Sequence, residues 1–416
     1  MQTLLIIGLV WPEPTSSAAG WRMMQLISLF LEQNLEVHFA SAAGKSAYSA
    51  DLKSLGVQEH DIDLNNSSFD VFVRNLNPVF VLFDRFIIEE QFGWRVRENC
   101  PNALTVLDTE DLHFLRKARE FAYKKNKEID LYTVDAKREL ASILRCDLSL
   151  IISKEEFNLL TQQFHIPPGL LHYLPFLENE ISKDDKQLWK SFEERKNFIF
   201  IGNFLHEPNW QAVLTLKKEI WPKINKQLTD AELHIYGAYA SQKVFDLQNK
   251  KEKFIVKDRA IDAKLTMQNY RILLAPINFG AGVKGKFIDA MKSGTPSVTT
   301  TIGAESMKQS LDWNGAIQDD FSLFIQDAID LYANENRWQI AQHHGVIIIN
   351  KNYSSAIFKA DFFWRIQNLM ENIQDHRKQH FISEILKFHF AQSSKYLSLW
   401  IEEKNRNVRA EKSAED

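Results

Sequence analysis

The segment from Arg271 to Thr300 contains the residues best suited to bind an anion. A short apolar run leads into Gly280 and Gly282, and Lys284 and Lys286 follow just before a helical pattern. Glycines allow a backbone to approach a ligand closely, and the first turn of a helix offers unpaired N–H groups and the positive end of its dipole. With the two lysines, these features suit a diphosphate, whose negative charge grows as it departs from a sugar.

Asp289 lies about one helical turn beyond Lys286, where its carboxylate can accept hydrogen bonds from ribose hydroxyls. The alternative is a glycine-rich turn that caps a surface helix, with both lysines in solvent. The glycine spacing matches neither the dinucleotide-binding fingerprint nor the P-loop. Spacing alone therefore leaves both interpretations open.

A second candidate anion site follows the first predicted strand, Leu4–Val10. The loop Ser16–Gly20, which includes Ser17 and Ala19, brings small residues to the start of a predicted helix, and Arg22 adds a positive charge. Backbone N–H groups at such a position can face an anion. Simple capping of the helix by Ser17 or by the serine before it explains the same residues.

The predicted strand Ala103–Leu107 ends in a run that contains Asp108, Glu110, Asp111 and His113. Asp108 and Glu110 can be interpreted as a metal-binding acidic pair, although oxygen-ligand sites use more ligands than this run supplies. Alternatively, Asp108 caps the next helix and Asp111 complements its dipole. We therefore expect no metal site.

Two charged runs near predicted strand ends have open roles. Asp84 and Arg85 suit either an acceptor site or structural ion pairs. The mixed-charge stretch Arg116–Glu128 predicts a solvated helix, or a surface that meets a phosphorylated or membrane-borne acceptor.

The composition is that of a globular protein. The 416 residues are 45% hydrophobic and 25% charged, with a formal net charge of -4 that gives no overall attraction to nucleic acid. Cys100 and Cys146 form neither a disulfide framework nor a metal spacing, which favours a reducing, cytoplasmic environment. The first apolar run lacks a basic flank and a cleavage site, and no apolar stretch approaches the ~20 residues needed to cross a bilayer.

Short apolar runs alternate with longer amphipathic stretches, the pattern of parallel sheets covered by helices. In the first such stretch, Trp21, Met24, Ile27 or Ser28, and Leu31 fall on one helical stripe. The predicted strands are Leu4–Val10, Val37–Ala40, Val79–Phe83, Ala103–Leu107, Leu148–Ile152, Phe198–Ile201, Leu233–Tyr236, Phe254–Val256, Ile272–Ala275 and Ser297–Thr299.

The strands form two series, separated by a linker-like region from Pro167 to about Lys196. We therefore predict an α/β fold with two doubly wound, Rossmann-like domains, at residues 1–180 and 190–350, that face each other across a cleft. Residues 351–416 are predicted to be a helical extension, partly packed across the domains, with a frayed end.

The run GAGVKGKFIDAMKSGTPSVTT resembles the donor-binding segment of GT-B glycosyltransferases, particularly family 4. FIFIGNFLHEPNWQAVLTLKKEIWPKI and the later AELHIYGA are similar to the start of the same family's nucleotide-binding domain. The resemblance covers about Phe198 to Thr301 well and the N-terminal half more loosely. It implies the GT-B type of fold, with the donor in the second domain and the acceptor mainly in the first.

The resemblance also implies roles for individual residues. Asp289 matches the second acidic residue of the family's paired-glutamate motif, which holds the ribose, whereas Ala281 stands where the first glutamate would be. The backbone near Gly282 and Val283 can then hold the sugar or phosphate. Gly202 and Asn203 occupy the place of the family's Gly-Arg clamp.

With that arginine replaced, Lys284 and Lys286 are expected to supply the charge. Ser17, Ala19, Gly20 and Arg22 belong to a segment that resembles the family's small-residue loop near the donor phosphates. His113 matches the histidine that contacts the sugar in the cleft, and Lys257 and Arg259 fall where a loop meets the nucleobase.

The predicted function is transfer of a sugar from a nucleotide-sugar to an acceptor, with retention of configuration and without a metal or other cofactor. The acceptor is expected to be a glycan, a lipid-linked molecule or a small molecule, and no nucleic acid is expected to bind. A cytoplasmic location, peripheral at the inner face of the membrane at most, fits these expectations. The alternatives are a nucleotide-sugar epimerase or hydrolase with the same fold, and a non-catalytic nucleotide-sugar-binding or scaffold protein.

Overall fold

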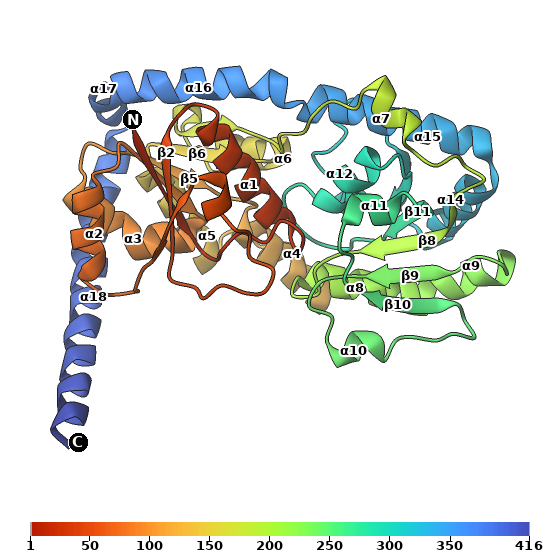
Figure 1. Cartoon of the computed structure of the whole chain (residues 1–416), viewed down its shortest axis with the longest axis horizontal. Helices are drawn as coiled ribbons and strands as arrows, with labels where there is room; N and C mark the ends of the chain where they lie inside the picture. The colour runs from red at the N-terminus through yellow and green to blue at the C-terminus, as the bar shows by residue number, and fades with distance from the viewer. Residues whose placement is uncertain (1, 416) are drawn as a thin grey trace.

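The structure, a computed structural model, describes residues 2–415 and contains two parallel β-sheets with helices packed against them (Figure 1). The first sheet has the strand order β3-β2-β1-β4-β5-β6-β7. Its strands are β1 (Thr3–Gly8), β2 (Glu36–Ser41), β3 (Gln58–Asp61), β4 (Phe80–Asp84), β5 (Leu104–Asp108), β6 (Leu148–Ile151) and β7 (Leu171–Tyr173).

The second sheet has the order β10-β9-β8-β11-β12-β13, and every pairing in it is parallel. The order reverses next to the first strand in both sheets, which is the doubly wound arrangement. The strands are β8 (Lys196–Ile201), β9 (Leu233–Tyr236), β10 (Phe254–Asp258), β11 (Tyr270–Ala275), β12 (Ser297–Thr299) and β13 (Gly315–Ile317).

Helices connect the strands and cover the sheets. In the first domain they are α1 (Ala18–Leu31), α2 (Ser68–Leu76), α3 (Phe86–Asn99), α4 (His113–Lys125), α5 (Val134–Arg145) and α6 (Lys154–Asn158). The linker contains α7 (Lys183–Gln187), and the second domain contains α8 (Glu207–Thr215), α9 (Trp221–Gln227), α10 (Gln242–Phe245), α11 (Ala263–Met267), α12 (Gly285–Lys292), α13 (Thr301–Ala304), α14 (Phe321–Ala333) and α15 (Glu335–Ile348).

The C-terminal helices leave the second domain and return to the first. They are α16 (Ser355–Glu371), α17 (Ile373–Gln379) and α18 (Phe381–Glu415). Phe362, Ile366 and Leu369 of α16 are buried in the apolar cluster that packs on one face of the first sheet, so this part of the chain belongs to the core of the first domain. No helix within the described residues is long and apolar enough to span a membrane.

All ten predicted strands are present, with ends displaced by at most two residues. The predicted stripe of α1 is confirmed only in part. Ile27 is buried, and Met24 and Leu31 pack against the core, whereas Trp21 and Ser28 are exposed. The buried face of α1 also includes Arg22, which forms an ion pair with Asp108 inside the domain, so a charged residue occupies a core position.

Candidate functional site

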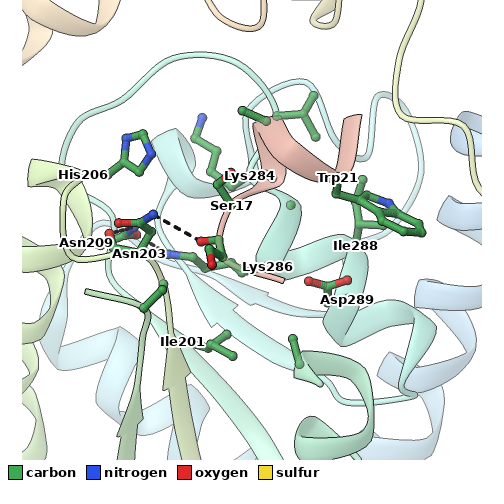
Figure 2. A pocket seen from close by; sticks show the side chains of 18 of the residues that line it. Ser17, Trp21, Ile201, Asn203, His206, Asn209, Lys284, Lys286, Ile288 and Asp289 are labelled. Carbon is green, nitrogen blue, oxygen red and sulfur yellow. Dashed lines mark hydrogen bonds between the residues drawn. The ribbon is translucent and has the colours of Figure 1, made fainter. Parts of the chain in front are cut away.

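The carboxyl ends of both sheets border a cleft of about 610 Å³ between the domains. The first domain contributes the start of α1 and the residues after β5. The second contributes the residues after β8 and the segment that leads into α12 (Figure 2). Ligands of doubly wound folds bind at this edge of the sheet, so the cleft is the place to examine.

The N-termini of α1 and α12 meet in the cleft. The Ser17 hydroxyl accepts a hydrogen bond from the Gly20 N–H group at 3.0 Å, which confirms that Ser17 caps α1. Ala18 and Ala19 belong to the first turn, whose N–H groups have no partner within the helix, and both line the cleft. A Cβ atom on Gly285, the first residue of α12, would lie 2.7 Å from the Ala18 Cβ atom, so the two helix ends are in close contact.

Lys284 and Lys286 bring two ammonium groups to this point (Figure 2). Lys284 Nζ donates to the carbonyl oxygen of Gly282 at 2.9 Å. Lys286 Nζ donates to Asn209 Oδ1 and lies 4.6 Å from the centroid of the Phe200 ring. Burial and the neighbouring charge of Lys284 lower the pKa of Lys286 to about 7. Because a charged lysine is costly here, a bound anion would stabilise its protonated form.

Asp289 lies at another side of the cleft, near Trp21 (Figure 2). Its carboxylate is 29% exposed and 4.0 Å from Lys264 Nζ. Burial raises the pKa of Asp289 to about 7, with Lys264 acting in the opposite direction. Lys264 Nζ also lies 4.7 Å from the Trp21 ring centroid. The carboxylate is therefore available to hydroxyl groups of a ligand in the cleft.

The first domain supplies a strongly charged wall, with Glu110, Asp111, Arg85 and Arg116 lining the cleft. Glu110 Oε1 is buried and has no hydrogen-bond partner among the described residues. Burial, reinforced by the negative charge of Asp108, raises the pKa of Glu110 to about 8. An unpaired carboxyl group of this kind suits a hydroxyl-rich ligand that can donate to it.

His113 lines the same wall. Burial lowers the pKa of its imidazole to about 4, although Asp111 acts in the opposite direction, so the ring is neutral near pH 7. Nε2 lies 3.5 Å from Asp111 Oδ1, and the ring meets Phe86 edge-on. The backbone N–H groups of His113 and Phe114 donate to Glu139 at 3.1 and 2.8 Å, which holds the start of α4 in place.

The structure brings most of the predicted site residues together and leaves several outside. Those lining the cleft are Ser17, Ala19, His113, Gly202, Asn203, Arg259, Val283, Lys284, Lys286 and Asp289. Lys257 is exposed and does not line it. The Gly20 N–H group is used in capping α1, and the Gly282 N–H group donates to Glu156 Oε1 at 2.8 Å, so neither amide is free for a ligand in this structure.

Arg22 does not supply charge to the cleft. Its side chain is 1% exposed, and Nε lies 3.0 Å from both carboxylate oxygens of Asp108. Because Arg22 holds both of its carboxylate oxygens, Asp108 does not line the cleft beside Glu110, its suggested partner in an acidic pair. Among the residues that the structure describes, no group of three or more His, Cys, Asp or Glu residues is arranged to hold a metal ion.

Several residues of the cleft are not among those predicted from the sequence. His206 and Asn209 line it, and both lie in the segment after β8 that carries the family resemblance. Trp21, which is expected on the apolar stripe of α1, is 36% exposed and lines the cleft. Arg85 and Arg116 belong to charged runs whose roles the sequence left open.

Polar contacts join the domains beside the cleft. Arg119 of α4 makes two hydrogen bonds of 2.7 Å to the carboxylate of Glu305, and its Nη1 atom also donates to the Gly280 carbonyl at 2.8 Å. Asn203 Nδ2 donates to the Ser16 carbonyl at 3.2 Å. The two walls of the cleft are thus held together by direct bonds.

Solved structures share this arrangement of two domains. A sucrose-phosphate synthase from Thermosynechococcus elongatus matches with a TM-score of 0.67 and 13% identity, over 89% of this chain and all of that one. S. aureus TarM matches with a TM-score of 0.67 and 8% identity over 89% and 100% of the two chains. The chain has the GT-B fold.

Sequence comparison finds a family model that matches part of the second domain. Residues 195–334 match the model of the family described as Glycosyl transferases group 1. An uncharacterized 44.6 kDa protein in the cps region of Klebsiella pneumoniae is 26% identical over 227 residues. That match spans 52% of this chain and about half, 55%, of the Klebsiella protein. The second domain of this GT-B chain therefore carries the sequence signature of group 1 glycosyl transferases.

Proposed function

We propose that this GT-B protein transfers a sugar from a nucleotide-sugar to a hydroxyl group of an acceptor. The observation that carries the proposal is the meeting of two helix N-termini with Lys284 and Lys286 in one cleft, with Asp289 nearby. The first-turn amides and the lysines match a diphosphate, and Asp289 matches the ribose hydroxyls.

Structures of the same fold support a uridine nucleotide as donor. Anabaena HepE, which has a TM-score of 0.64 and 9% identity to this chain, was solved with UDP and glucose. S. aureus TarM was solved with UDP and α-GlcNAc-glycerol. We therefore propose a UDP-sugar as the first donor to test, and a hydroxyl-rich glycan or glycoside as acceptor beside the charged wall of the first domain.

The proposed reaction forms one bond and breaks one. The acceptor oxygen attacks the anomeric carbon of the sugar while the bond from that carbon to the diphosphate oxygen breaks. Retention without a covalent intermediate requires attack on the face from which the diphosphate departs, and the acceptor proton then passes to the departing phosphate oxygen. Lys284, Lys286 and the helix amides stabilise the charge that develops on the diphosphate.

No metal is required in this scheme, because these groups compensate the charge. The neutral imidazole of His113 can orient a sugar hydroxyl. Exclusion of water by the joined domains limits hydrolysis of the donor.

Titration of the purified protein with UDP, GDP and ADP, followed by an assay for transfer from the matching nucleotide-sugars, tests the proposal. We expect one nucleotide to raise the melting temperature. At a nucleotide concentration of about 100 times its Kd, the free energy of unfolding should increase by roughly 2.7 kcal/mol. Lys286→Met should weaken that binding about tenfold or more, since charge-assisted bonds to phosphate contribute ~1.5–3 kcal/mol. Lys257→Met, which removes an exposed lysine outside the cleft, should have little effect.

Two outcomes would contradict the proposal. Equal binding by wild type and Lys286→Met would place the diphosphate elsewhere. Release of free or epimerised sugar at the same rate with and without acceptors would indicate a hydrolase or an epimerase of the same fold.

A further inference from the structure

Two residues at neighbouring strand ends of the first domain share an unusual backbone conformation. Strands β4 and β5 are paired, and Arg85 directly follows β4 while Glu110 lies just beyond β5. Their φ angles are 72° and 63°. Residues with a side chain rarely adopt such positive angles, and those that do are concentrated at active sites and ligand-binding sites. Both residues line the cleft.

The side chains of both residues lack hydrogen-bond partners in the described part of the chain. The Arg85 side chain is 17% exposed and donates no hydrogen bond there, and its Nε atom lies 3.5 Å from Asp84 Oδ1. The Glu110 carboxyl accepts no hydrogen bond from the same residues, although its Oε1 atom is buried. Buried polar groups are normally paired within a protein, so each exception needs an explanation.

A structural ion pair does not explain these two side chains. Arg22 and Asp108 of the same domain form such a pair, since Arg22 Nε lies 3.0 Å from both carboxylate oxygens and both side chains are almost fully buried. Burial raises the pKa of Glu110, and the Arg85 guanidinium is close enough to oppose that rise. Yet the two side chains form no ion pair with each other among the described residues. Both groups are therefore available to a ligand in the cleft.

The charges around the two side chains balance. Asp84 lies beside Arg85, and Arg116 Nε lies 3.4 Å from Asp111 Oδ2. Burial raises the pKa of Glu110 to about 8, so its carboxyl is mostly uncharged near pH 7. An anionic ligand would find no excess of positive charge at this wall and would face the carboxylates of Asp84 and Asp111. The wall therefore favours a neutral ligand.

Sugar hydroxyl groups match both side chains. A hydroxyl can accept from the guanidinium of Arg85, which only donates, and it can donate to the Glu110 carboxyl. Two hydroxyls on adjacent ring carbons present one such group to each side chain at a fixed spacing. An ionised carboxylate or phosphate could accept from Arg85 but has no hydrogen to donate to the unpaired Glu110 oxygen.

The two side chains belong to the wall that contacts the segment before Lys284. A Cβ atom on Gly282 would lie 2.8 Å from the Asp111 Cβ atom and 3.6 Å from the Glu110 carbonyl oxygen. A sugar held by Arg85 and Glu110 would therefore lie close to the place proposed above for the donor diphosphate.

We propose that Arg85 and Glu110 bind two adjacent hydroxyl groups of a neutral sugar and thereby select a neutral glycan or glycoside as the acceptor. The assignment of this sugar as the acceptor rests on the proposed transfer reaction, whereas its binding does not. A further hydroxyl of the same molecule is then left to attack the donor. In this division of roles, Lys284 and Lys286 hold the diphosphate, and the two residues of the first domain hold the acceptor.

Ligand-observed NMR titration of the full-length protein, with and without UDP, tests the proposal. The neutral probes are the methyl glycosides of glucose, galactose, mannose and N-acetylglucosamine, and the anionic probe is the methyl glycoside of glucuronic acid. We expect at least one neutral glycoside to bind wild type, and the glucuronic acid glycoside to bind more weakly than that of glucose. Arg85→Met and Glu110→Leu should each weaken neutral glycoside binding about tenfold or more, because each leaves a ligand hydroxyl without its partner. Glu110→Gln should retain most of the binding, since an amide also donates and accepts.

Glu90→Gln is the matched control for the change at Glu110. Glu90 accepts two hydrogen bonds from Arg138 of the same domain and does not line the cleft, so its variant should bind sugars as wild type does. The affinity for UDP should be equal in all variants.

Unaltered melting temperatures show that the variants fold. Arg85→Gly replaces Arg85→Met if that variant does not, because glycine adopts a positive φ angle without strain. Absence of binding by every neutral glycoside, tighter binding of the glucuronic acid glycoside than of its glucose counterpart, or equal sugar binding by wild type and both weakened variants would overturn the proposal. So would a parallel loss of UDP affinity in Arg85→Met, because Arg85 would then bind the diphosphate. Intact glycoside binding without any UDP binding would contradict the proposed donor and support this sugar site.

Discussion

At the scale of single residues, Lys286 shows how the cleft is prepared for a ligand. Its ammonium group is surrounded by Asn209, the Phe200 ring and the charge of Lys284. This environment lowers its pKa to about 7, so part of its charge is lost in the free protein near neutral pH. A diphosphate would reverse the shift, because an adjacent anion favours the protonated lysine.

We therefore predict that nucleoside diphosphate binding weakens as the pH rises from about 7 to about 9. The complex retains the Lys286 proton that the free protein loses, so the affinity falls by up to about tenfold per pH unit above the pKa. The diphosphate itself stays fully charged in this range, since a terminal phosphate has a second pKa near 6. Calorimetric titration at several pH values measures the slope.

Lys286→Met is the control for this slope. Asp289, whose pKa is raised to about 7, ionises in the same range and should strengthen contacts with ribose, an effect of opposite sign. In Lys286→Met the downward slope should become shallower, because the Lys286 contribution is lost while Asp289 and Glu110, whose pKa is raised to about 8, still ionise in this range. An equal downward slope in wild type and variant would show that another group controls the dependence.

Residue types in the sequence predicted much of the second-domain side of the cleft but not the direction of every side chain. Lys284, Lys286 and Asp289 follow a buried strand and open a helix, a pattern that fixes their position. Arg22 follows an equally suggestive loop, yet it points inward, because Asp108 from a strand 86 residues away neutralises it. Such a long-range partner cannot be inferred from spacing.

At the scale of elements, the contact between α1 and α12 brings the N-termini of two helices, one from each domain, together in the cleft. Gly285 begins α12 and Ala18 begins α1, and there is no room for a side chain between them. Gly285 is therefore needed for the close approach of two backbones rather than for a special backbone angle.

We predict that Gly285→Ala impairs transfer far more than it impairs folding. The added Cβ atom would lie 2.7 Å from the Ala18 Cβ atom, so α1 and α12 must separate. A misplacement of about 1 Å can cost ~100-fold in rate. Gly44→Ala is the matched control, because nothing lies within 4 Å of a Cβ atom there. Turnover and melting temperature of both variants are measured; equal turnover would contradict a role for this contact.

The elements found from sequence are those with continuous apolar runs, and the missed ones lack them. β3, β7 and β13 were not predicted. β3 has the sequence QEHD with no apolar residue, and it pairs at the edge of its sheet. β7 and β13 have three residues each and also lie at sheet edges. Tertiary pairing rather than local preference makes these segments extended.

At the scale of the whole molecule, specific polar contacts hold the two domains together in a closed arrangement. Arg119 and Glu305 are the main ion pair across the domains beside the cleft, and each side chain is 16% exposed. Bidentate arginine–carboxylate pairs combine strength with a fixed orientation. Arg119 also reaches the Gly280 carbonyl, which couples the pair to the segment before Lys284.

We predict that Arg119→Ala shifts the protein toward an open form. The change leaves the Glu305 carboxylate and the Gly280 carbonyl without their partner in a half-buried setting, at a cost of about 2 kcal/mol. That difference changes the ratio of open to closed molecules about 30-fold. Small-angle scattering should show a larger radius of gyration, and turnover should fall while nucleotide binding to the second domain persists.

Arg138→Ala separates this effect from the general loss of a surface charge. Arg138 forms a two-bond pair with Glu90, but both residues belong to the first domain, and the Arg138 side chain is 47% exposed. Its removal should change neither the radius of gyration nor turnover. If both arginine variants behave like wild type, other contacts between the domains keep the cleft closed, among them the Lys124–Glu207 ion pair at 2.7 Å and the Gly282–Glu156 hydrogen bond at 2.8 Å.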